Sequence, residues 1–190
     1  MTEEHDPNLE LDFPAASAAL MQTVEVQTEQ VAQRQRLISA KLQIPYPVEQ
    51  VWKVLSEYEA LTEFIPNLAK SRRLEHPTGG IRLEQVGTQR LLRFNFSARV
   101  VLDLEEKFPH EINFNMVEGD FKAYSGSWRL EPYSLCDRMG TNLLYTVLLW
   151  PKLTMPVAII ERRLSSDLQF NLLAIRQRVD ELFGTPGLGC

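Results

Sequence analysis

Cysteine and histidine are scarce in this sequence. Among its 190 residues are two cysteines, Cys136 and Cys190, and three histidines, His5, His76 and His110. The cysteines are too few for a disulfide framework, and no histidine is spaced with a second ligand as zinc sites require. We therefore expect two free thiols and neither a metal nor a cofactor.

Long apolar runs are absent as well. No stretch reaches the roughly 18 consecutive apolar residues that a membrane-spanning helix needs. The N-terminal residues Met1–Asp6 are acidic and lack both the apolar core of a secretory signal and the arginines of a transit peptide. These absences favour a cytoplasmic protein without a transmembrane segment.

Basic residues are not in excess, and familiar catalytic motifs are missing. The formal net charge is −5 and the pI is about 5.3, so a nucleic-acid binder that neutralises phosphates is not expected. No glycine-rich phosphate loop is present, and Ser125–Ser127 lacks the glycine pattern of a nucleophile elbow. We assign no catalytic residue, and an enzyme is the less favoured interpretation.

The length and the patterning indicate one domain with two short extensions. A domain typically has about 100–200 residues. Residues 1–22 are acidic, then alanine-rich, and show no sustained periodicity, which is typical of a flexible arm. We expect one domain over residues 23–184 and a short C-terminal tail over residues 185–190.

Much of the chain between residues 23 and 150 alternates apolar and polar side chains, as half-buried strands do. The clearest run is Leu92–Glu105, in which apolar side chains take every even position. Short turns between the runs imply an antiparallel meander. The expected strands cover residues 24–26, 37–44, 70–75, 81–91, 92–105, 111–117, 121–131 and 142–150, with a polar loop over 132–141.

Helical spacing occurs in three segments. One helix is predicted from Pro47, with its apolar residues on one face, and a second over residues 58–65, which Pro66 stops. The longest begins near Pro156 and keeps an apolar residue at every third or fourth position until Gly184. Its apolar stripe comprises Val157, Ile160, Leu164, Leu168, Leu172, Ile175, Val179 and Leu182.

The order of these elements predicts an α+β fold with an internal cavity. The long C-terminal helix can bury its stripe only against the apolar face of the sheet. The antiparallel sheet must therefore curve around the helix, while the two short helices after the first strand cover one end. A curved sheet that wraps a helix leaves interior space lined by alternate strand residues, which is how apolar small-molecule sites are built.

The inward positions of the expected strands and of the long helix supply the candidate binding residues. Tyr124, Tyr145 and Trp128 each add a polar group that could orient a ligand. The alternative is that these aromatic rings only fill the core. The candidate ligand-binding residues are Phe94, Phe96, Phe114, Met116, Tyr124, Trp128, Tyr145, Val147, Leu164 and Leu168.

Three segments and the long final helix resemble a known family. Pro47–Leu55, Phe64–Leu68 and Gly126–Leu130 are similar to the polyketide cyclase/dehydrase branch of the START-like (SRPBCC, helix-grip) superfamily, which includes coenzyme-Q-binding proteins. The resemblance covers about residues 34–183. It implies the helix-grip fold and a hydrophobic cavity for lipids, isoprenoid quinones, polyketides or similar molecules. It transfers no catalytic motif, because that superfamily shares no single one.

Binding or carrying a small hydrophobic ligand is the preferred hypothesis for function. The first alternative is a cyclase- or dehydratase-type enzyme without a metal, which needs an ionisable group inside the cavity. Tyr124, Tyr145 and Arg99 are its candidates. Arg99 is expected on the outer face of its strand, where it could pair with Asp103, unless the register of the strand is reversed.

The second alternative is a protein-interaction domain built on the same scaffold. It would be favoured by an exposed apolar patch on the short helices, around Phe64, Ile65 and Leu68. A protein partner is therefore kept as a hypothesis, and so is a transient contact with a membrane. The sequence identifies neither the ligand nor the oligomeric state.

Overall fold

The computed structural model describes residues 24–91, 94–135 and 138–184, and it describes side chains for these residues except 89–91, 94–96, 135 and 138. The predicted arm over residues 1–22, the predicted tail over 185–190 and both cysteines lie outside the described residues. No helix in the described part of the chain is long and apolar enough to cross a membrane.

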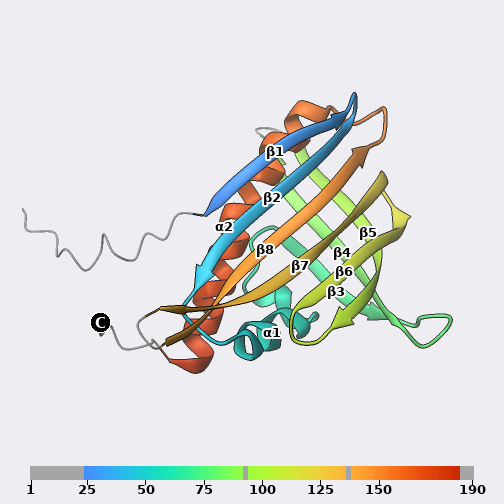
Figure 1. Ribbon diagram of the computed structural model, residues 1–190. Coiled ribbons are helices and arrows are strands. Elements are labelled where there is room, and N and C mark those ends of the chain that lie inside the picture. Colours follow the sequence, from blue (N-terminus) through green and yellow to red (C-terminus); the bar gives the residue numbers. More distant parts are fainter. Residues whose placement is uncertain (1–23, 92–93, 136–137, 185–190) are drawn as a thin grey trace, which may run out of the picture.

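The described residues form one curved antiparallel sheet with a long helix across it (Figure 1). The strand order is β1-β2-β8-β7-β6-β5-β4-β3. This architecture confirms the predicted α+β helix-grip fold. The strands are β1 Glu25–Ala32, β2 Gln35–Ile44, β3 Leu68–Leu74, β4 Ile81–Leu91, β5 Phe94–Lys107, β6 Glu111–Gly119, β7 Phe121–Leu135 and β8 Arg138–Pro151; the helices are α1 Val48–Ser56, the short 3₁₀ helix η1 Ala60–Glu63 and α2 Val157–Phe183.

Helix α2 covers the apolar face of the sheet. Its stripe is buried through Ile160, Leu168, Leu172, Ile175 and Val179. The helix packs against β1, β2 and α1, and Figure 1 shows it running along the β1–β2 side of the sheet. It ends at Gly184, whose φ of 78° suits a residue without a Cβ.

The outer face of β5 is polar, as the alternation predicts, but the predicted pairing of Arg99 with Asp103 is wrong. Residues four apart in a strand are about 13 Å apart along it. Partners on the neighbouring strand are closer. Asp103 lies opposite Arg82 on β4 and accepts hydrogen bonds of 2.6 and 2.8 Å from its guanidinium. Arg99 instead pairs with Glu84 at 2.7 Å and with Glu118 at 2.6 Å.

The prediction of a polar loop over residues 132–141 is also wrong. Strands β7 and β8 stay paired through this segment, from Glu131 opposite Asn142 to Leu135 opposite Arg138. Backbone hydrogen bonds form regardless of side-chain polarity, so a polar composition does not end a ladder. Thr141 is fully buried there and donates a 2.7 Å hydrogen bond to the backbone oxygen of Tyr46.

The first short helix forms as predicted, and the second is shorter than predicted. Helix α1 buries Val51, Trp52 and Leu55 against the core, as its spacing predicts. The second predicted helix, over residues 58–65, is reduced to the single 3₁₀ turn η1. Tyr58 lies before this turn, and its hydroxyl donates a 2.5 Å hydrogen bond to Glu106 on β5. Pro66 ends the segment on the other side.

Candidate functional site: an apolar cavity under the C-terminal helix

A cavity of about 310 Å³ lies between the sheet, the α1–η1 segment and α2. Its volume falls in the range of about 300–1,000 Å³ that is usual for small-molecule sites. Strands β4 to β8 form its walls through inward side chains such as Leu83, Leu102 and Ile112. The predicted space between the curved sheet and its helix is therefore present.

Most of the predicted binding residues lie at this cavity. The side chains of Phe94 and Phe96 lie outside the described residues, so their placement is not tested. Met116 is not among the lining residues. The predicted residues that do line the cavity are Phe114, Tyr124, Trp128, Tyr145, Val147, Leu164 and Leu168.

Met116 lies on the inner face of β6, opposite the cavity residue Leu102, but beyond the end of the cavity. The register between β5 and β6 shifts after Leu102, which faces Met116, so that Val101 faces Glu118. The side chain of Met116 lies toward the β6–β7 turn, where its sulfur is 2.8 Å from the position of a Cβ on Gly119. It packs against the core there. Alternation predicts the face on which Met116 lies but not how far along the sheet the cavity extends.

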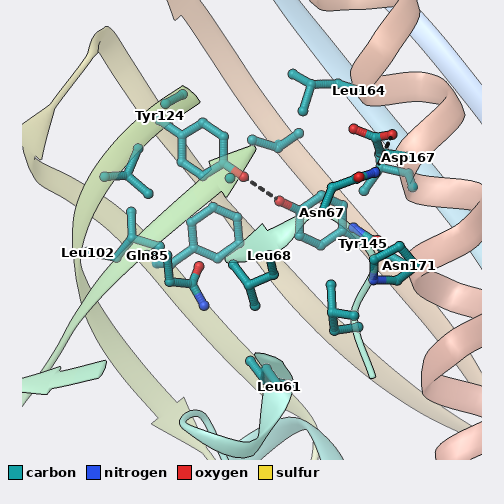
Figure 2. A pocket seen from close by; sticks show the side chains of 18 of the residues that line it. Leu61, Asn67, Leu68, Gln85, Leu102, Tyr124, Tyr145, Leu164, Asp167 and Asn171 are labelled. Carbon is teal, nitrogen blue, oxygen red and sulfur yellow. Dashed lines mark hydrogen bonds between the residues drawn. The ribbon is translucent and has the colours of Figure 1, made fainter. Parts of the chain in front are cut away.

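Inside the cavity two tyrosine hydroxyls meet. The hydroxyl oxygens of Tyr124 on β7 and Tyr145 on β8 are 2.9 Å apart and share a hydrogen bond (Figure 2). The ring of Phe114 contacts both, with centroid distances of 5.6 and 5.8 Å. Burial raises the pKa of both phenols above the ordinary value. Both groups are therefore neutral at physiological pH.

The third predicted polar aromatic residue behaves differently. Trp128 packs against Tyr145 with ring centroids 4.3 Å apart. Its indole nitrogen forms no hydrogen bond to the described residues. Trp128 therefore contributes apolar surface to the cavity wall, while the two tyrosines provide the polar groups.

The cavity opens between the N-terminal half of α2 and the segment that joins η1 to β4. Exposed lining residues mark this mouth, namely Pro66, Asn67, Thr88, Pro156, Ile159 and Arg163. Asn67 has a left-handed backbone with φ of 63°, and its backbone oxygen accepts a 2.8 Å hydrogen bond from the amide of Thr88. This contact ties the two strand ends at the mouth together.

The mouth also holds a carboxyl group, Asp167, which the sequence analysis did not propose as a site residue. Asp167 on α2 accepts a 3.4 Å hydrogen bond from the side-chain amide of Asn67 (Figure 2). Burial raises its pKa from 3.8 to about 6, against the opposing effects of the Arg163 charge and the Asn67 hydrogen bond. Asn171, one turn further along, also lines the cavity and has a buried side-chain oxygen without a described partner.

One signal in the sequence could have found Asp167. It lies three residues after Leu164 and directly before Leu168, which places it at the border of the apolar stripe of α2. A carboxyl at such a border is held partly out of water. The contact to Asn67, by contrast, joins residues 100 positions apart and has no signature in the sequence.

The exposed apolar patch considered for a protein-interaction domain is absent from the short helices. Phe64, Ile65 and Leu68 are half-buried. Ile65 and Leu68 line the cavity, and the guanidinium carbon of Arg178 lies 5.6 Å from the ring centroid of Phe64. Ile65 and Leu68 form part of the end wall of the cavity, together with Leu55, Tyr58 and Leu61, whereas Phe64 does not line it.

The candidate acid–base groups of the enzyme hypothesis do not all lie at the cavity. Tyr124 and Tyr145 line the cavity, whereas Arg99 does not. Among the described residues there is no group of three or more histidine, cysteine, aspartate or glutamate side chains that could hold a metal ion.

The cavity-bearing part of the chain matches a protein-family model. Residues 44–172 match the family described as polyketide cyclase/dehydrase and lipid transport. The ribosome association toxin RatA of Escherichia coli is 27% identical over 97 residues. That alignment covers 51% of this chain and 59% of RatA, so the chain spans little more than half of this relative.

Solved structures share the fold. A START superfamily protein from Mycobacterium smegmatis superposes with a TM-score of 0.64 at 17% identity, covering 77% of this chain and 98% of the other. The Zhui aromatase/cyclase from Streptomyces sp. R1128 gives a TM-score of 0.61 at 16% identity, covering 77% and 94%. At such identities these similarities establish the fold alone.

Proposed function

This chain belongs to the polyketide cyclase/dehydrase and lipid transport family, and from that premise we propose that it binds a small, largely apolar molecule in the cavity under α2. The observation that carries the proposal is the cavity itself, whose lining is mostly apolar, with polar groups mainly at its mouth. This is the usual composition of a small-molecule site.

The size of the cavity supports the proposal that it binds a ligand. Its volume of about 310 Å³ is far larger than the voids that packed protein interiors leave. An apolar ligand that entered through the mouth would gain dispersion contacts with walls that water satisfies poorly.

Native mass spectrometry of the purified protein tests the proposal, combined with organic extraction to identify what is released. We expect a bound species of defined mass. The variant Ala98→Phe fills the cavity from β5, because Ala98 is a lining residue. It should lose the bound species. Ser97→Phe places the same ring on the exposed opposite face and should keep it.

The same two variants show which outcomes would contradict the proposed ligand binding. Equal occupancy in Ala98→Phe and Ser97→Phe would place the bound species outside the cavity. A wild-type protein that carries nothing, and that takes up no apolar probe, would contradict the proposal.

Proton-transfer chemistry on the bound molecule is a second candidate function. Asp167 favours it, because a carboxyl with a pKa of about 6 at the edge of an apolar cavity can both give and take a proton near neutral pH. The test is incorporation of deuterium from D₂O into the extracted ligand. Wild type should incorporate deuterium and Asp167→Asn should not, while incorporation at the same rate in both would exclude this role for Asp167.

A further inference from the structure

The two tyrosine hydroxyls in the cavity leave one proton without an acceptor. Tyr124 and Tyr145 each carry one O–H group. Only one of them can donate across the 2.9 Å contact between their oxygens, whichever it is. Neither hydroxyl has another hydrogen-bond partner among the described residues. The second O–H therefore has to be satisfied by something that is not part of the described protein.

The O–H group without an acceptor lies in a buried, apolar environment. Tyr145 is only 5% exposed, and the rings of Phe114 and Phe121 pack on the pair. Figure 2 shows the two hydroxyls pointing toward each other inside the cavity. A buried donor without a partner is costly, so such groups are normally paired in folded proteins.

We infer that the ligand of this cavity carries a carbonyl oxygen, which accepts the remaining proton of the Tyr124–Tyr145 pair. The inference rests on the proposed function, since it assigns one chemical group of the bound molecule. A carbonyl supplies lone pairs without bringing a further proton that would itself need an acceptor. A charged group would lose its hydration among apolar walls and is disfavoured.

Three probes of nearly one shape test the assignment. Methyl naphthyl ketone carries the carbonyl, isopropenylnaphthalene replaces its oxygen by CH₂, and naphthylethanol carries a hydroxyl instead. Their affinities are measured by isothermal titration calorimetry for wild type, for Tyr124→Phe/Tyr145→Phe and for Tyr133→Phe. Tyr133 is the matched control, because it lies on β7 like Tyr124 but does not line the cavity.

The ratio of ketone affinity to alkene affinity is the decisive quantity, because general hydrophobicity cancels between the proteins. We expect this ratio to fall about tenfold in the double variant, as the loss of one hydrogen bond implies. It should stay at the wild-type value in Tyr133→Phe. Each single variant should keep part of the preference, because the remaining hydroxyl still has a proton to donate. The infrared carbonyl band of the bound ketone should lie lower in wild type than in the double variant.

The outcomes separate this inference from the proposed function. The inference is overturned if ketone and alkene bind both proteins with the same ratio, while the proposed function then stands. A tyrosine-dependent preference for naphthylethanol over the ketone would overturn the carbonyl assignment. If no probe binds wild type, both the proposed function and the inference fail. The double variant removes both partners together, so its fold should persist, which a thermal melt checks.

Discussion

Replacing Asp167 by asparagine is expected to stabilise the protein at neutral pH. Asp167 is half-buried at the mouth of the cavity. Desolvation raises the pKa of its carboxyl from 3.8 to about 6 and outweighs the Arg163 charge and the Asn67 hydrogen bond. The folded protein therefore holds this proton more tightly than the unfolded chain does. Asparagine has nearly the same shape and helix propensity and carries no charge.

The sign and the size of the effect follow from linkage. Stabilisation by the neutral acid is fully present below about pH 4 and is lost as the pH rises through about 6. A difference of roughly two pH units corresponds to about 3 kcal/mol at 1.36 kcal/mol per unit. Solvent screens a half-buried group, so we expect about 1 kcal/mol. Asp167→Asn should gain this amount over wild type at pH 7.5 and almost nothing at pH 4.

Urea unfolding followed by far-ultraviolet circular dichroism at the two pH values measures this difference. Ser166→Ala is the control, since it alters the neighbouring exposed position on α2 without removing a carboxyl, and its effect should not depend on pH. A stability difference between Asp167→Asn and wild type that is equal at both pH values would refute the reasoning. So would a loss of stability in the variant at pH 7.5.

Three further substitutions probe the sheet, and one of them is a control. Gly126→Ala places a Cβ 1.9 Å from the backbone oxygen of Thr146 and 2.8 Å from Phe114, so it should lower the free energy of unfolding, measured by urea titration, by about 3 kcal/mol. The control Gly87→Ala, whose Cβ has its nearest atom at 3.8 Å, should be tolerated. Equal losses of stability in the two variants would contradict the predicted clash. Hydrogen bonds from Lys70 and Arg99 lower the pKa of Glu84 to about 2, so its carboxylate stabilises the folded state above about pH 4.5 and this contribution is lost as the pH falls toward 2. Melting temperatures of Glu84→Gln should therefore lie below those of wild type at pH 7 and approach them in acid, whereas a constant gap would exclude this linkage.

The repeating patterns of the sequence predicted those parts of the site that depend on one element at a time. Alternation along β6, β7 and β8 placed Phe114, Tyr124 and Tyr145 on the inner face, and the helical stripe placed Leu164 and Leu168 opposite them. Each of these positions follows from the geometry of a single strand or helix. The cavity then follows from packing one apolar face on the other.

The parts that were missed depend on how separate segments meet. The extent of the cavity, which stops short of Met116, depends on several elements, and the hydrogen bond between Asn67 and Asp167 spans 100 residues. The choice of Arg82 over Arg99 as partner of Asp103 follows from the β4–β5 register. None of these contacts has a local pattern, so a single sequence does not predict them.

The position of α2 at the end of the domain affects when the protein can first take up its ligand during synthesis. Chains emerge from the ribosome N-terminus first, and the strands of this sheet all precede α2. Until the ribosome has released residues up to about Phe183, the aromatic face of β6–β8 has no cover. The nascent chain therefore exposes this apolar surface until α2 has left the ribosome, so delayed synthesis of α2 or its truncation would favour capture by chaperones or aggregation.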